Sequence, residues 1–180
     1  MHRRVLAAVA ATVLLFTTTS CGQSKEEKTA IDSLTEKIKS GDDNDNIEIF
    51  GDDFPHCFAE KLVNGAGVEE LKKDKVLDDE GKAAEDISSI DKVSDKTADA
   101  FADAEYDCID FDSVRTYLKD SDEAKDATDE QVDAYVDCLQ DIDEDEWKAS
   151  NKDQAMGKAD SENVTKFGEE SAECQKKLEE

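Results

Sequence analysis

Four cysteines in the body of the chain constrain its fold more than any other feature. They are Cys57, Cys108, Cys138 and Cys174. Each lies on or beside a stripe of apolar residues with the spacing of an amphipathic α-helix, and the stripe around Cys138 consists of Val132, Tyr135, Val136, Leu139 and Ile142. Signals for β-strands are nearly absent. We therefore expect an all-α fold, a helical bundle stapled by disulfides.

Aromatic residues recur at fixed distances from these cysteines. One stands three positions before Cys57 and Cys138, and another stands seven positions before Cys108 and Cys174. Both distances place the aromatic side chain on the same helical face as the cysteine. The repeat predicts that the bundle is built from two similar helical modules, in each of which the first and last helices are joined.

The modules, at about residues 52–110 and 129–180, also predict how the cysteines pair. Four cysteines allow three sets of pairs. The duplication predicts Cys57–Cys108 and Cys138–Cys174. If the shared spacings arise by chance between unrelated amphipathic helices, the pairing stays open.

Local signals indicate where several helices begin and end. The segment Thr128-Asp129-Glu130-Gln131 has the pattern of a capping box. Asp53 is a candidate N-cap, with Pro55 in the first turn, where its missing N–H costs little. Gly65 and Gly67 are candidate stops for the helix that follows.

Three further segments have simple patterns. Residues 68–73 are expected to form a short helix, and so are residues 31–38, ahead of a break at Ser40-Gly41. Residues 47–50 alternate between apolar and polar, and we expect them to be an extended lead-in.

One helical stripe is interrupted by a charged residue. Its apolar members are Ala98, Phe101, Ala102, Tyr106, Cys108 and Ile109. Glu105 falls seven positions after Ala98 and therefore on the same face.

The N-terminal segment has the layout of a secretory signal. Two arginines precede an apolar run from Val5 to Phe16 that is too short to span a bilayer. Ser20-Cys21-Gly22 then resembles the lipobox of bacterial lipoproteins, with Thr18 in the place that usually holds leucine. The resemblance implies a signal peptide at residues 1–20 and a mature chain that begins at Cys21, with a diacylglyceryl group on the cysteine sulfur.

A lipid on Cys21 sets the expected location. Two or more acyl chains give stable membrane anchoring. We expect residues 21–51 to be a tether with one short helix, and residues 52–180 to be a helical domain on the extracytoplasmic face of the plasma membrane. Ordinary signal cleavage would instead leave Cys21 as an odd free thiol.

The charge of the chain excludes one class of partner. It carries 48 acidic and 22 basic residues, a formal net charge of −26. Such a surface repels nucleic-acid phosphates and anionic lipid headgroups, so we expect no nucleic-acid binding and no membrane contact beyond the lipid. The hydrophobic content of 37% lies below the roughly 45–50% of ordinary domains, which predicts a thin core that depends on its crosslinks.

Three segments carry a resemblance to a known group of proteins. They are Cys57-Phe-Ala-Glu-Lys-Leu-Val with Gly67-Val-Glu-Glu-Leu, Tyr106-Asp-Cys108-Ile-Asp-Phe, and Tyr135-Val-Asp-Cys138-Leu. They resemble segments of small four-cysteine helical extracytoplasmic proteins, mostly lipoproteins, of high-GC Gram-positive bacteria. The likeness covers most of residues 50–180. It implies a secreted, disulfide-stapled helical domain and brings no catalytic residues with it.

Catalytic motifs are scarce in the expected mature chain. His56 is its one histidine, and the adjacent Cys57 is better explained as half of a disulfide. The tetrapeptide Phe54-Pro55-His56-Cys57 is similar to the redox site of thioredoxin-like proteins, but phenylalanine replaces the nucleophilic cysteine. We therefore expect no enzymatic activity and no cofactor.

Calcium is the metal most compatible with this composition. Oxygen ligands with the spacing of a calcium loop are Asp42, Asn44, Asn46 and, at the twelfth position, Asp53. Ile47 stands where the loop requires a turn glycine, which weakens this interpretation. A second acidic run is expected to cap a helix instead and consists of Asp141, Asp143 and Asp145.

Together these features favour a non-enzymatic, membrane-anchored envelope protein that acts through contacts with another protein or an envelope polymer. The alternative is an envelope protein that binds a small ligand or calcium, with a groove between the two modules as the ligand site.

Overall fold

The computed structural model describes residues 23–40, 49–85, 92–121 and 124–179. Helices make up most of this part of the chain. They are α1 (Lys25–Ser40), α3 (Phe54–Ala66), α4 (Val68–Lys73), α5 (Asp95–Cys108), α6 (Phe111–Asp120), α7 (Asp129–Gln140), α8 (Glu144–Ala155), α9 (Glu162–Gln175) and the 3-10 helix η3 (Lys176–Leu178). Among the described residues, β-type pairing is limited to an isolated bridge between Leu77 and Ala83. The predicted all-α fold is confirmed.

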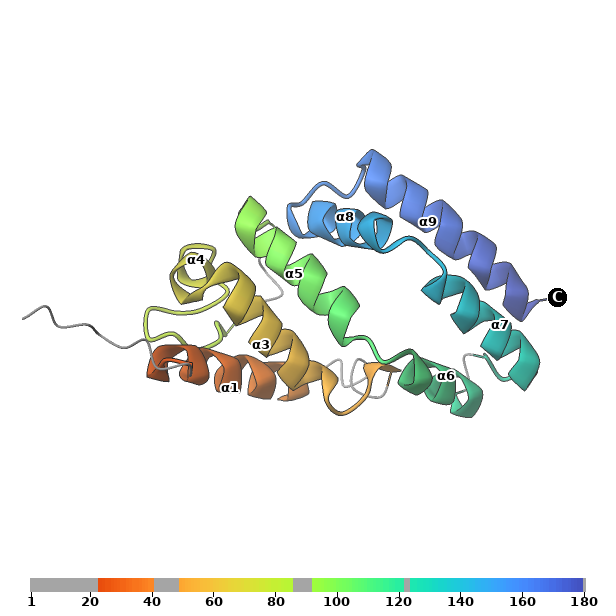
Figure 1. The fold of residues 1–180 in the computed structure, drawn as a ribbon, viewed down its shortest axis with the longest axis horizontal. Helices are drawn as coiled ribbons and strands as arrows, with labels where there is room; N and C mark the ends of the chain where they lie inside the picture. Colours follow the sequence, from red (N-terminus) through yellow and green to blue (C-terminus); the bar gives the residue numbers. More distant parts are fainter. Residues whose placement is uncertain (1–22, 41–48, 86–91, 122–123, 180) are drawn as a thin grey trace, which may run out of the picture.

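Five of the helices form a layered stack across the molecule (Figure 1). α3 packs between α1 and α5, α5 packs on its other side against α8, and α8 packs against α9. α6 and α7 pack together at one end of the stack, where η3 also meets α7 (Figure 1). α5 therefore joins the first half of the chain to the second.

Two disulfides staple these helices in the predicted pairs. Cys57–Cys108 joins α3 to α5, with the two Cα atoms 5.8 Å apart. Cys138–Cys174 joins α7 to α9, with a Cα separation of 5.5 Å. The prediction from the aromatic spacings is confirmed, and the loops that the disulfides close span 51 and 36 residues.

The two crosslinked units share their helix order but differ in packing. In the first unit, the disulfide links the first turn of α3 to the last residue of α5, and the two helices run antiparallel side by side (Figure 1). In the second unit, Cys138 and Cys174 both lie in the last turn of their helices, so α7 and α9 meet at their C-terminal ends. The two predicted modules are therefore similar in the order of their helices along the chain, but not in how those helices pack.

The buried side chains form three apolar clusters, in keeping with the low hydrophobic content. The first lies between α1, α3, α4 and α5 and includes Ile31 and Leu71. The second surrounds Val136 of α7. The third surrounds Trp147 of α8, whose ring centroid lies 4.9 Å from that of Phe167 on α9.

Helix α1 belongs to the first of these clusters. We expected residues 21–51 to be a tether with one short helix, but α1 is 16 residues long. Ile31 and Leu34 are each only 2% exposed, because the apolar stripe of α1 packs against α3. The packed part of the chain thus includes α1 and extends beyond the expected domain at residues 52–180.

Most local signals correspond to helix ends. Thr128 forms both hydrogen bonds of the predicted capping box with Gln131. Gly67 ends α3 with a φ of 80°, a left-handed conformation that favours glycine, whereas Gly65 lies within the helix. Of the expected extended lead-in, residues 47 and 48 lie outside the described part, and residues 49 and 50 are helical.

Candidate functional site

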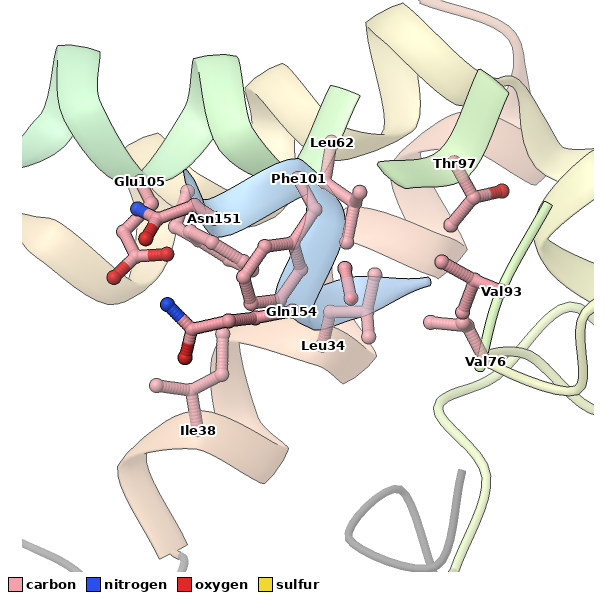
Figure 2. A pocket seen from close by; sticks show the side chains of 12 residues that line it. Leu34, Ile38, Leu62, Val76, Val93, Thr97, Phe101, Glu105, Asn151 and Gln154 are labelled. Carbon is pink, nitrogen blue, oxygen red and sulfur yellow. The ribbon is translucent and has the colours of Figure 1, made fainter. Parts of the chain in front are cut away.

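A cavity of about 440 Å³ lies where the first half of the chain meets α8. Its walls come from α1, α3, α5 and α8 and from the segments around residues 76 and 93. The lining is mostly apolar, and its apolar side chains are Leu34, Ile38, Phe58, Leu62, Val76, Val93, Phe101 and Ala155 (Figure 2). Small-molecule sites in proteins are mostly apolar concavities of about 300–1,000 Å³. The cavity has both properties.

Hydrogen bonds outside the helices hold the walls in place. The Ser94 side chain caps α5 by accepting from the Thr97 backbone N–H, and its hydroxyl donates to Asp74 Oδ2 at 2.6 Å. Because Asp74 ends α4, this contact ties α4 to α5. The backbone N–H of Val93 donates to the carbonyl of Ala155 at 3.0 Å, so the segment before α5 is joined to the end of α8.

Three polar side chains gather at one end of the cavity (Figure 2). They are Glu105 of α5 and Asn151 and Gln154 of α8. Thr97, the remaining polar residue of the lining, lies at the other end near Val93, and its hydroxyl oxygen is 3.4 Å from the hydroxyl oxygen of Ser94 (Figure 2). The cavity thus has an apolar body and one polar end.

Burial raises the pKa of Glu105 to about 7, because the ionised carboxylate loses its hydration. Within the described part of the chain, no cation and no hydrogen-bond donor contacts this carboxyl group to offset that cost. Near neutral pH the Glu105 carboxyl group therefore changes between its neutral and ionised forms.

Asn151 is a second polar side chain whose burial is not offset by hydrogen bonds at Nδ2 among the described residues. The residue is 8% exposed, and its Nδ2 atom is buried without a hydrogen-bond partner in the part of the chain that the structure describes. A buried polar group in this state costs about 1–3 kcal/mol. The neighbouring Ser150 is fully buried and accepts a hydrogen bond from Gln154 Nε2 at 3.3 Å. The N–H groups of Asn151 therefore lack an acceptor among the described residues at the polar end of the cavity.

The two lysines through which α8 contacts α5 form no ion pair with Glu105. Lys148 and Lys152 instead pair, at N–O distances of 2.6 to 3.4 Å, with acids along another edge of α5, which are Asp95, Asp99, Asp103 and Asp107. These ion pairs hold α8 against α5 and leave the opposite edge to the cavity. Glu105 is the one ionisable group in the described lining of the cavity.

The residues predicted from sequence to bind calcium are not brought to this site. Asp42, Asn44 and Asn46 lie outside the described residues. Asp53 is exposed and holds the N-cap position of α3 without a side-chain capping hydrogen bond. Residues 23–40, 49–85, 92–121 and 124–179 contain no group of three or more His, Cys, Asp or Glu side chains that could hold a metal ion.

Two other predictions concern residues at helix ends. Asp143, from the second acidic run, accepts hydrogen bonds from the backbone N–H groups of Asp145 and Glu146, so it caps α8 as expected. His56 is exposed in the first turn of α3, beside Cys57, whose sulfur is bonded to Cys108. Cys57 therefore offers no thiol for the redox chemistry that its tetrapeptide suggested. Cys21 lies outside the described residues.

Sequence reasoning noticed one of the three polar residues at the cavity. It identified Glu105 as an interruption of an apolar stripe and gave it no role, and it did not single out Asn151 or Gln154. One signal was available for Asn151, which follows the buried Trp147 by four positions and therefore lies on the same face of α8.

Comparisons with protein-family models, with curated proteins and with solved structures found no match. The disulfides do indicate a compartment, because such bonds form and persist in oxidising, non-cytoplasmic environments. In the described ranges, no helix has the length and apolar character needed to cross a membrane.

Proposed function

We propose that this protein is an extracytoplasmic binding protein that holds a small, largely apolar ligand in the cavity between α1, α3, α5 and α8. The observation that carries the proposal is the cavity itself, with apolar walls from four helices and a polar end at Glu105 and Asn151. Apolar walls supply binding free energy by removing ligand surface from water, and a few polar groups fix its orientation.

The position of the cavity matches one of the two roles expected from sequence. It lies between the first crosslinked unit and α8 of the second, which is the groove between modules that a ligand binder would use. A role in contacts with another envelope protein or polymer has the expected lipid anchor as its support. The cavity is a further observation that supports ligand binding, so ligand binding is the function that we favour.

A neutral solvatochromic dye such as Nile red tests this proposal on the soluble chain that begins at Gly22. We expect saturable binding with a blue-shifted emission, because the cavity is apolar. Ala155→Leu adds three carbon atoms to the cavity wall and should weaken dye binding at least about tenfold. Ala172→Leu, at an exposed position of α9, is the matched control and should bind as the parent does.

The dye result can contradict the proposal in two ways. Binding that is absent from the parent would show that the cavity does not accept apolar molecules. Binding that is equally strong in Ala155→Leu and Ala172→Leu would place the dye elsewhere on the surface. In both variants, a thermal melt confirms that the fold is retained.

We also propose that the protein is held at the membrane by a lipid on Cys21. Support comes from the lipobox-like Ser20-Cys21-Gly22 and from the non-cytoplasmic compartment that the disulfides indicate. Metabolic labelling with an alkyne-bearing fatty acid should mark the protein in cells and should fail in Cys21→Ser. An unlabelled parent would indicate ordinary secretion instead.

A further inference from the structure

The ligand class follows from the polar end of the cavity, if the cavity is a ligand site as proposed above. We propose that the ligand is an amphipathic amine, whose apolar body lies against Phe101, Leu62 and Leu34 and whose ammonium group is bound by Glu105 and Asn151. The apolar and polar parts of such a molecule match the two ends of the cavity (Figure 2).

The acid at the polar end of the cavity is unpaired among the described residues. Glu105 has no ion-pair or hydrogen-bond partner among the described residues, and burial is the one cause that shifts its pKa. Removing one partner from a buried charge is costly, and supplying one recovers that cost. An ammonium group supplies the missing charge.

No described lysine pairs with Glu105, and four lysines on the elements around it have other partners. Lys61 of α3 pairs with Asp107, Lys148 and Lys152 of α8 pair with acids on another edge of α5, and Lys37 of α1 donates to the Glu85 carbonyl. A ligand cation would therefore supply a charge partner that Glu105 lacks among the described residues.

A carboxamide lies beside the acid. Asn151 is buried, its Nδ2 atom has no hydrogen-bond partner in the described part of the chain, and its side chain lies at the same end of the cavity as Glu105 (Figure 2). An ammonium group has three N–H donors, which one carboxylate alone does not use up. An ammonium group has no acceptor for the N–H groups of Asn151, so these would donate to Glu105, while the amide oxygens of Asn151 and Gln154 accept from the ammonium group.

The same geometry disfavours the other simple headgroups. A carboxylate ligand would place a second negative charge beside Glu105, in a protein whose formal net charge is already −26. An alcohol can donate to Glu105 but brings no charge. We therefore expect the order of affinity to be amine, then alcohol, then carboxylate for one alkyl chain.

Decylamine, 1-decanol and decanoate test this order by displacing the neutral dye at about pH 8 and high salt, where loose attraction of amines to the acidic surface is screened. Decylamine should bind at least about tenfold more tightly than decanol, and decanoate should bind least. Glu105→Gln should remove the preference for decylamine over decanol. Glu169→Gln, at an exposed position of α9, should retain the preference.

A pH series on the parent provides a readout that needs no variant. The ammonium group requires ionised Glu105, whose pKa is about 7 in the free protein. Amine affinity should therefore fall by up to about tenfold for each pH unit below 7, whereas decanol affinity should not fall. In Glu105→Gln, amine affinity should be independent of pH over this range.

The possible outcomes distinguish a wrong ligand class from the absence of a ligand site. If decanol binds as tightly as decylamine, or if Glu105→Gln keeps the amine preference, the ligand is not an amine although the cavity remains a ligand site. If neither the dye nor decanol binds the parent, the cavity is not a ligand site and both proposals fail.

Discussion

Gly65 of α3 and Ala100 of α5 meet where the two helices cross, and a Cβ atom added to Gly65 would lie 2.8 Å from the Cβ of Ala100. That distance is shorter than carbon atoms tolerate, and neither residue has a flexible end that could move aside. The close approach of the two helices, which the Cys57–Cys108 disulfide crosslinks, therefore depends on glycine at this position.

We predict that Gly65→Ala lowers the free energy of unfolding by about 1–2 kcal/mol. Overpacking costs about 1–3 kcal/mol, and the higher helix propensity of alanine returns up to about 1 kcal/mol. The measurement is chemical denaturation of the soluble chain.

Gly168→Ala is the matched control for Gly65→Ala. Gly168 lies within α9 with nothing within 4 Å of its added Cβ, so alanine there should stabilise the protein by about 0.5–1 kcal/mol. If both substitutions stabilise the protein, α3 and α5 are not in the close contact described.

The two disulfides should each contribute about 4 kcal/mol, because each removes the entropy of a long loop from the unfolded chain. Replacing Cys57 and Cys108 together by alanine, or Cys138 and Cys174 together, should lower the denaturation midpoint strongly. Small domains usually have a free energy of unfolding of about 5–15 kcal/mol, and reduction of both disulfides should leave little of it. Peptide mapping without reduction checks the pairs, and a peptide that links Cys57 to Cys138 would contradict them.

The cysteine pairs could be predicted because the same local spacings recur in both halves of the chain. Each cysteine lies on an apolar helical face, and the aromatic residue three or seven positions earlier marks that face. The same reasoning located the Val68–Lys73 helix and the capping box at Thr128, since both depend on neighbours in sequence. Such signals indicate helices and their faces without indicating which faces meet.

The cavity could not be predicted, because it depends on contacts between distant segments. Glu105 and Asn151 belong to α5 and α8, and only the packing of these helices places them together (Figure 2). Likewise the stripe on α1 is visible in sequence, but its partner α3 lies beyond a break, so α1 was assigned to a tether. The residues of α6 lacked a cysteine to draw attention to them and were not recognised as a helix.

Lys148 should be the most important lysine of the α5–α8 contact. Its Nζ atom lies 2.7 Å from Glu144, 2.9 Å from Asp103 and 3.4 Å from Asp107. Burial lowers the pKa of Lys148, but the bonds to Glu144 and Asp103 and the nearby charges more than offset this and leave the pKa raised. Lys148→Met should cost about 1–2 kcal/mol near pH 7, since it leaves several acids without their cation.

The cost of Lys148→Met should shrink as the pH falls. The pKa of Asp107 is lowered, first by the hydrogen bond from Lys61, with burial opposing, and then by Lys148. A carboxyl group whose pKa is lowered in the folded state stabilises the fold at pH values above its ordinary pKa. This contribution is lost as the pH falls through the lowered pKa. Urea denaturation at about pH 7 and about pH 3 checks this, with Lys28→Met, exposed on α1, as the control. An equal cost at both pH values would show that the lysine contributes through packing alone.

Glu105 should make the protein less stable as the pH rises from about 4.5 to about 7. In the folded protein, burial raises the pKa of Glu105 to about 7 from an ordinary value of 4.5. Between these pH values the folded state keeps a proton on Glu105 that the unfolded state has lost. The unfolded state is therefore favoured as the pH rises, by at most about 3 kcal/mol above pH 7. Glu105→Gln should abolish this decline and raise the melting temperature at about pH 8, while leaving it nearly unchanged at about pH 4. Glu169→Gln on the exposed face of α9 should behave as the parent at both pH values. If stability still declines with pH in Glu105→Gln, another group causes the decline. The Glu105 carboxylate would then lie in water rather than at the end of an apolar cavity.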